Sequence, residues 1–110
     1  MLPPHLRLRR SGDFGPVIKQ GYRVVRPTLV MYARPAAGTR VGLVVGRAIG
    51  GAVQRNWVKR QLRHGAAALI DAAAPMDVVV RALPGAASAG GGLRADLSTA
   101  WGAAREAVHA

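Results

Sequence analysis

The sequence predicts a single-domain α+β protein in which helices lie on one β-sheet. The chain has 110 residues, of which 50% are hydrophobic, so it can form one modest core but not two. Helical and strand-like patterns follow one another in the order helix, strands, helix, strand, helix, which is typical of helices packed on a sheet. No internal repeat is visible, and we expect one domain over residues 1–110.

The first helix and the strands after it are predicted from local patterns. Residues 12–20 have apolar side chains at helical spacing, between Ser11 as an N-cap and Gly21 as a C-cap. The next segment, RVVRPTLVMYAR (residues 23–34), contains a central proline, which favours two short strands or one strand interrupted at a sheet edge. Because the turn sequence PAAGT separates it from RVGLVVG (residues 40–46), we expect an antiparallel strand pair here.

The second half of the chain is predicted to form two more helices around one strand. Residues 52–74 have a helical pattern that Pro75 ends, and DVVVRAL at residues 77–83 predicts a buried strand. The glycine-rich segment 84–92 is expected to be a flexible loop, and residues 1–10 a flexible basic N-terminus. A terminal amphipathic helix is predicted from five apolar residues at helical spacing, which are Leu93, Leu97, Trp101, Ala104 and Val108.

Charge is the most unusual property of the composition. The chain has 16 Lys and Arg residues against 5 Asp and Glu, a formal net charge of +11. Residues 1–64 contain 13 of the basic residues and one acid, a net +12, whereas residues 65–110 contain 3 basic and 4 acidic residues, a net −1. Such an excess is usually neutralised by a polyanion, so we expect a nucleic acid to bind the first two thirds of the chain.

Several classes of protein are excluded or disfavoured by what the sequence lacks. It contains no cysteine, which excludes disulfides, thiolate metal sites and a cysteine nucleophile. We find neither an apolar run long enough to cross a bilayer nor the apolar core of a signal peptide, so a soluble, cytoplasmic protein without a membrane partner is expected. The three histidines and five acids form no metal or nucleophilic motif. We therefore expect no catalytic residue and no metal site in the protein itself, with Asp71 and Asp77 either capping local structure or solvated.

The segment RNWVKRQLRH at residues 55–64 contains many hydrogen-bond donors and no acid. On a helical wheel the polar donors share one arc, and the apolar Val58, Leu62, Leu69 and Ala73 share another. Adjacent like charges repel each other, so a merely solvated face explains the pattern less well than a phosphate-binding face, for which arginine is well suited. A membrane-binding helix fits less well again, because the opposite face is mostly alanine.

The approach to this helix, VGRAIGGAVQ, contains three glycines. Free backbone N–H groups at a helix N-terminus favour an anion, but the glycines equally fit a flexible connection from strand to helix. The segment matches neither a Walker loop nor GxGxxG, so a nucleotide-binding site is not predicted.

Together these segments resemble the bacterial ribonuclease P protein family. The run VGRAIGGAVQRNWVKRQLRH is similar to the family's signature, in which a basic strand end leads through a glycine-containing turn into R-N-x-x-K-R-x-x-R on a helix. LRLRRSGDFGPVIKQG resembles the family's opening helix, LVMYAR its aromatic-bearing strand and DVVVRALPGA its late strand. The chain departs from the pattern at Ala48, where the family has a basic residue, at Gly51, usually asparagine, and at Trp57, often arginine.

The resemblance implies an α-β-β-β-α-β-α sandwich with a central four-stranded sheet and a left-handed βαβ crossover, the fold of one domain of a small-subunit ribosomal protein. It implies the protein subunit of ribonuclease P, a ribonucleoprotein endonuclease that removes the 5′ leader of precursor tRNA. In that enzyme the RNA subunit holds the catalytic Mg²⁺ ions, so neither a cofactor bound by the protein alone nor an obligate protein partner is expected. The implied contacts to ribonuclease P RNA are made by Arg47, Arg55, Asn56, Lys59, Arg60 and Arg63.

A second surface is implied for the single-stranded leader, in a cleft between the opening helix and the sheet. The residues at the family's positions are Arg9, Arg10, Phe14, Ile18, Tyr32 and Arg34. A basic groove with aromatic side chains suits single-stranded RNA, because the cations follow the backbone and aromatic faces stack on any base. Ordinary core packing of Phe14 and a solvent-facing Tyr32 are the alternatives.

Trp57 lies on neither arc of the basic helix and can either stack on RNA or pack against a neighbouring loop.

Two other functions fit part of the sequence. A non-enzymatic RNA-binding or ribosome-assembly protein on the same fold would share the basic helix. A small DNA-binding protein could place residues 53–70 in the major groove, but neither a helix-turn-helix partner nor a dimer seam is recognisable.

Overall fold

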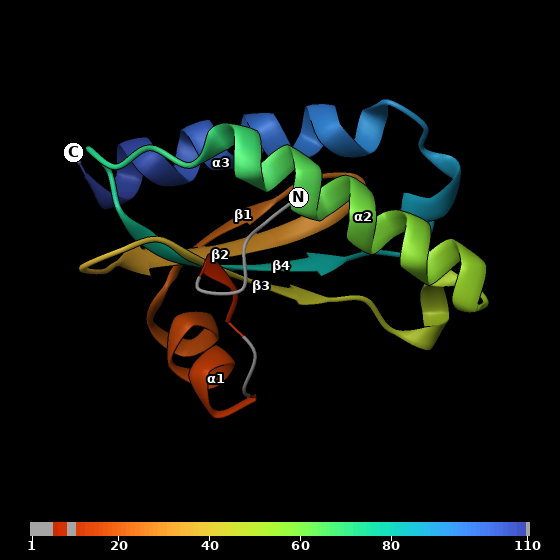
Figure 1. The fold of residues 1–110 in the computed structure, drawn as a ribbon, viewed down its shortest axis with the longest axis horizontal. Coiled ribbons are helices and arrows are strands. Elements are labelled where there is room, and N and C mark those ends of the chain that lie inside the picture. The colour runs from red at the N-terminus through yellow and green to blue at the C-terminus, as the bar shows by residue number, and fades with distance from the viewer. Residues whose placement is uncertain (1–5, 9–10, 110) are drawn as a thin grey trace.

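The computed structural model describes residues 6–8 and 11–109, with the backbone alone at residues 11–13 (Figure 1). Within these ranges the helices and strands follow in the order α1 (Ser11–Gln20), β1 (Tyr22–Val25), β2 (Leu29–Pro35), β3 (Arg40–Val44), α2 (Ala52–Leu69), β4 (Met76–Ala82) and α3 (Gly92–Val108). This is the α-β-β-β-α-β-α order that the family resemblance implies, and it confirms the α+β fold class. Pro27 lies between β1 and β2, so the segment predicted as two short strands or one interrupted strand forms two strands.

The four strands form one mixed sheet in the order β1-β2-β4-β3. β2 pairs antiparallel with β1 and with β4, whereas β3 pairs parallel with β4. The predicted antiparallel pairing of β2 with β3 is therefore wrong, because β4 lies between them. Residues 76–80 of β4 are all buried, and a strand buried on both faces belongs in the interior of a sheet. β3 is left at an edge.

The helices are distributed unequally over the two faces of the sheet. Of the described helices, α2 and α3 lie side by side on one face and α1 lies on the other (Figure 1). The connection from β3 through α2 to the parallel strand β4 is a βαβ crossover of the left-handed sense (Figure 1). The main hydrophobic core fills the space between the sheet and the helix pair, and a smaller cluster of Leu8, Val17 and Val79 lies beneath α1.

The helix α2 is shorter than its sequence pattern predicts. It ends at Leu69 and not at Ala74, and its last backbone bond runs from the N–H of Ile70 to the carbonyl of Ala66, 3.1 Å away. The side chain of Asp71 then accepts a hydrogen bond from the N–H of Ala73 at 2.9 Å, which forms a local turn. An aspartate that bonds the backbone ahead of it competes with the helix, and this explains the early end.

The terminal helix and the preceding loop agree in position with their predictions. Leu93, Leu97, Trp101 and Ala104 are buried along α3, and Val108 is half-buried. Residues 84–92 contain a single 3-10 turn over Ala86–Ser88 that buries Ala86 against the core. The flexibility of this loop and of residues 1–10 stays a prediction.

One buried carboxylate attaches the β1–β2 connection to α3. Asp96 accepts hydrogen bonds from the Thr28 N–H at 3.0 Å and from the Thr28 hydroxyl at 2.6 Å, and its other oxygen lies 3.6 Å from Arg26 Nε. The hydrogen bond from the Thr28 hydroxyl, together with the Thr28 N–H and the charge of Arg26, lowers the pKa of Asp96 despite the opposing effect of burial. The carboxylate form is therefore the one that holds the connection.

Asp96→Asn is expected to lower the free energy of unfolding by about 1–2 kcal/mol at pH 7, because the charged acceptor is removed while the volume is kept. The pKa of Asp96 is lower in the folded state, so its contribution is present above the unfolded-state pKa and is lost as pH falls through the folded-state pKa. Urea unfolding at several pH values should therefore show the difference from wild type shrinking below about pH 4. Asp71→Asn, at an exposed ion pair with Arg105, should have almost no effect. An Asp96→Asn difference that stays constant in acid would contradict this assignment.

Candidate nucleic-acid interface

Four of the predicted donors of α2 form one basic surface along the helix. Asn56 and Arg60 are exposed and Lys59 and Arg63 are half-buried, and these four line a shallow pocket together with His64. We call these five residues the α2 basic face. None of its cations forms an ion pair with a carboxylate among the residues whose side chains are described. Concentrated, unneutralised cations of this kind attract a polyanion.

Two further predicted RNA-binding residues lie at the start of α2, with different surroundings. The Arg55 guanidinium donates to the Gly50 carbonyl at 2.9 Å, so this cation is partly used to hold the turn that precedes the helix. Gly50 has a φ of 143°, a conformation that side chains rarely adopt, and the turn therefore depends on glycine at this position. Arg47 is exposed in a 3-10 turn over Arg47–Ile49, which Ile49 anchors by its burial in the core.

The position of Trp57 favours packing over RNA stacking. Its side chain is half-buried and packs against the main hydrophobic core. The helical wheel places it outside the core arc, on the flank of α2 that also contains Gln61 and Gly65. This flank packs against α3, because a Cβ atom at Gly65 would lie 2.7 Å from Leu97 Cδ2. Trp57 therefore fills space beside the core, where the family's frequent arginine would contribute a charge instead.

The predicted leader cleft lies on the opposite face of the sheet, next to α1. Phe14 and Tyr32 are half-buried and pack against the cluster of Leu8, Val17 and Val79, and Ile18 is 40% exposed. Arg9 and Arg10 fall outside the described residues. The aromatic side chains thus contribute to packing and also keep part of their surface open.

Phe14 is seated directly on the edge strand. A Cβ atom built at Gly42 would lie 2.6 Å from Phe14 Cε1 and 3.0 Å from the Leu8 Cβ, so the ring occupies the space that any other side chain at this position of β3 would need. The open side of the ring lines a hollow with Arg7, Lys59 and Arg63. The α2 basic face and the aromatic cleft are therefore contiguous around the β3 edge, through Lys59 and Arg63.

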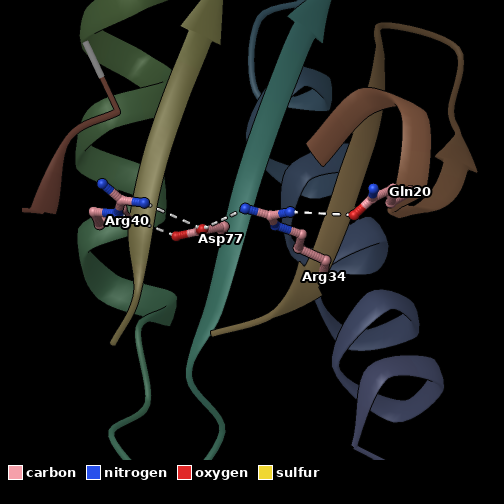
Figure 2. A network of polar contacts seen from close by, with 4 residues as sticks. All are labelled: Gln20, Arg34, Arg40 and Asp77. Carbon is pink, nitrogen blue, oxygen red and sulfur yellow. Dashed lines mark hydrogen bonds and ion pairs between the residues drawn. The ribbon is translucent and has the colours of Figure 1, made fainter. Parts of the chain in front are cut away.

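Arg34 is the predicted cleft residue that the structure places differently. Its guanidinium lies 3.7 Å from the buried carboxylate of Asp77 and donates to Gln20 Oε1 at 3.4 Å. Asp77 also accepts two hydrogen bonds from Arg40, at 3.2 and 3.3 Å (Figure 2). Asp77 is thus neither a cap nor solvated, and Arg34 is engaged within the protein.

Arg7 and Arg81 are not among the predicted site residues, because nothing in the sequence distinguishes them except their charge. Arg7 reaches the β3 edge because the N-terminal segment pairs with Val41, and the N–H of Leu8 donates to the Val41 carbonyl at 2.9 Å. Arg81 is exposed on the same sheet face as Tyr32, in register with Val30 and Val44 of the neighbouring strands. Only the strand order places Arg7 beside Phe14 and Arg81 on the sheet face that carries Tyr32.

Neither a metal centre nor a membrane span is recognisable in the described part of the chain. Among residues 6–8 and 11–109, no three His, Cys, Asp or Glu side chains are grouped so that they could hold a metal ion. No helix in these ranges is both long and apolar enough to cross a membrane.

Comparisons with known sequences identify one family. The family model described as Ribonuclease P matches residues 2–105. The chain is 46% identical over 97 residues to the ribonuclease P protein component of Mycobacterium avium, covering 81% of this chain and 82% of that protein. The ribonuclease P protein component of a second Mycobacterium, strain KMS, is 41% identical over 116 aligned residues, covering 100% of this chain and 98% of the relative.

Solved structures agree in fold. An RNase P protein mutant of Staphylococcus aureus with defective mRNA degradation activity superposes with a TM-score of 0.82 over 92% of this chain and 89% of that chain, at 23% identity. The RNase P protein of Thermotoga maritima has a TM-score of 0.69 at 26% identity, covering 84% of this chain and 92% of that chain. The shared architecture extends over most of both proteins.

Proposed function

The chain belongs to the ribonuclease P protein family, and from this premise we propose that it is the RNA-binding subunit of a cytoplasmic ribonuclease P, which removes the 5′ leader of precursor tRNA. The observation that carries the proposal is the α2 basic face, whose cations have no carboxylate partner among the described side chains. The donors suit an RNA backbone, since guanidinium and amide groups bind phosphate and sugar oxygens at fixed geometry.

We assign the two surfaces to two RNAs. The α2 basic face binds ribonuclease P RNA, whose phosphates supply the counter-charges that the protein does not. The cleft formed by Phe14, Ile18 and Tyr32 binds the single-stranded leader, because half-exposed aromatic and apolar side chains accept a base without reading its identity. The RNA subunit supplies the Mg²⁺ and the chemistry, and the protein's own residues bind and orient both RNAs.

Reconstitution tests the proposal as a whole. The chain is combined with a bacterial ribonuclease P RNA and a precursor tRNA at low Mg²⁺, where phosphate repulsion between the two RNAs is least screened by the metal. The protein should accelerate leader cleavage well above the rate of the RNA alone. RNA binding without any gain in cleavage would instead support a non-enzymatic RNA-binding or ribosome-assembly protein on the same fold.

Removing two cations from the α2 basic face should change the salt dependence of binding. For Arg60→Ala with Arg63→Ala, we expect the slope of log affinity for ribonuclease P RNA against log salt to become shallower by about 0.7–0.9 for each phosphate that is no longer neutralised. Arg94→Ala with Arg105→Ala is the charge-matched control, because these cations lie on α3 and bind Gln61 and Asp71. Equal slopes for the two double variants would contradict the assignment of α2.

Changing the aromatic ring of the cleft should affect leader recognition selectively. Phe14→Leu keeps an apolar side chain above Gly42 but removes the stacking face, and we expect affinity for leader-bearing precursor tRNA to fall about fivefold or more. Affinity for mature tRNA and for ribonuclease P RNA should stay as in wild type. If all three affinities fall together, Phe14 is a packing residue only.

A further inference from the structure

We propose that Arg34 is a positioning residue, which fixes the C-terminal end of α1 through Gln20 and so sets the cleft, and that it does not bind RNA phosphate. The proposal rests on the proposed function of the cleft, and it reverses the role that the family resemblance implies for Arg34. The observation behind it is a chain of polar contacts that crosses three strands and ends on α1 (Figure 2).

The chain of contacts begins at a buried charge. Asp77 is 3% exposed in the central strand β4, and its register partners on the two neighbouring strands are Arg34 of β2 and Arg40 of β3. A carboxylate in this position needs a cation, because an unpaired buried charge is strongly destabilising. Arg40 binds both of its oxygens, at 3.2 and 3.3 Å, and so supplies most of the neutralisation.

Arg34 occupies the other side of the same carboxylate, at the longer distance of 3.7 Å. This leaves the second arm of its planar guanidinium directed toward α1, where it donates to Gln20 Oε1 at 3.4 Å (Figure 2). A guanidinium can hold two acceptors in a fixed geometry, which a lysine ammonium on its flexible stem does not. Both terminal nitrogens of Arg34 are thereby directed at partners within the protein.

The Arg34–Gln20 hydrogen bond lies where it controls the orientation of α1. Gln20 is the last residue of the helix, and a Cβ atom at the following Gly21 would lie 2.3 Å from the Val17 carbonyl and 3.0 Å from the Ala33 carbonyl. The C-terminal end of α1 therefore rests directly on β2, beside Arg34. Farther along the helix, Val17 is fully buried and Phe14 rests on Gly42.

The consequence for the cleft follows from the shape of α1. It is a helix of ten residues with no other described helix on its face of the sheet (Figure 1), and it carries Phe14 and the partly exposed Ile18. Release of its C-terminal end would move these side chains relative to Tyr32 on β2. Arg34 thus acts on the leader through the placement of α1, without touching the RNA.

A double-mutant cycle on affinity for leader-bearing precursor tRNA, measured with the reconstituted holoenzyme at several salt concentrations, tests the proposal. Arg34→Gln and Gln20→Ala should each weaken affinity by about two- to tenfold, the range for one polar contact, and the double variant should be no worse than either. The salt slope should stay as in wild type. Arg34→Lys keeps the charge but should weaken binding as Arg34→Gln does.

Arg81→Gln is the matched control, because Arg81 is an exposed cation on the same sheet face with no ion pair to a described carboxylate. The fold-changes in affinity caused by Arg81→Gln and by Gln20→Ala should multiply in the double variant, as expected for two independent residues. The proposal is overturned if Arg34→Gln makes the slope shallower by about 0.7, the change for one phosphate of single-stranded RNA, while Arg34→Lys binds normally and Gln20→Ala has no effect.

Hydrogen exchange on the free protein separates this proposal from the function of the cleft. Gln20→Ala and Arg34→Gln should speed exchange of the α1 amides while the protection of β2 and β4 stays unchanged. If wild-type holoenzyme bound leader-bearing and leaderless tRNA equally, the proposed function of the cleft would fail, yet faster α1 exchange would still support the positioning role. Unchanged α1 exchange in both variants would refute it.

Discussion

The position of β4 between β2 and β3 determines how the two proposed RNA surfaces meet. Because β4, with its buried residues 76–80, occupies the interior of the sheet, β3 becomes an edge strand, and the helix that follows it, α2, lies above that edge. Phe14 reaches the other face of the same strand over Gly42, which has no side chain to exclude it. With β2 and β3 adjacent instead, Lys59 and Arg63 would not share a hollow with Phe14.

Three of the five acids of the chain stabilise the fold at a distance from α2 and so leave the cations of its basic face without a carboxylate partner among the described side chains. Asp77 binds Arg34 and Arg40 within the sheet, Asp96 holds Thr28 and Arg26 against α3, and Asp71 pairs with Arg105. All of these contacts lie away from the α2 basic face. Residues 1–64 carry a net charge of +12, against −1 for residues 65–110. Some of the cations in the first segment form ion pairs within the fold, and those of the α2 basic face remain uncompensated by any described carboxylate.

Local patterns suffice for the elements whose stability is mainly local. The periodicity of Leu93, Leu97 and Trp101 predicts α3, and the proline at position 27 predicts the break between β1 and β2. Four of the five donors on the predicted arc, all except Arg55, lie together. The order of the strands in the sheet is not predictable in the same way, because it depends on contacts between segments that are far apart in the sequence. The turn at residues 35–39 has the composition of a hairpin, and only the burial of β4 on both faces shows that a third strand enters between its flanks.

The same limit applies to individual side chains. A cation next to an aromatic strand looks like a phosphate ligand in sequence. The contacts that support a positioning role for Arg34 arise only because Asp77 is its register partner on a strand 43 residues later. The wheel leaves the role of Trp57 open because it cannot show that a second helix, α3, packs against the flank of α2 that contains Gln61 and Gly65. In both cases a contact outside the local pattern decides the role.

The most direct measurement is directed hydroxyl-radical cleavage of RNA in the reconstituted complex. The chain contains no cysteine, so single cysteines can carry a tethered iron chelate at His64 on the α2 basic face, at Ile18 in the cleft and at Ser98 on α3. We expect His64→Cys to direct cleavage of ribonuclease P RNA, Ile18→Cys to cleave the precursor tRNA leader, and Ser98→Cys to cleave neither. Cleavage from Ser98→Cys as strong as that from His64→Cys, or an intact leader with Ile18→Cys, would contradict the assignment of the two surfaces.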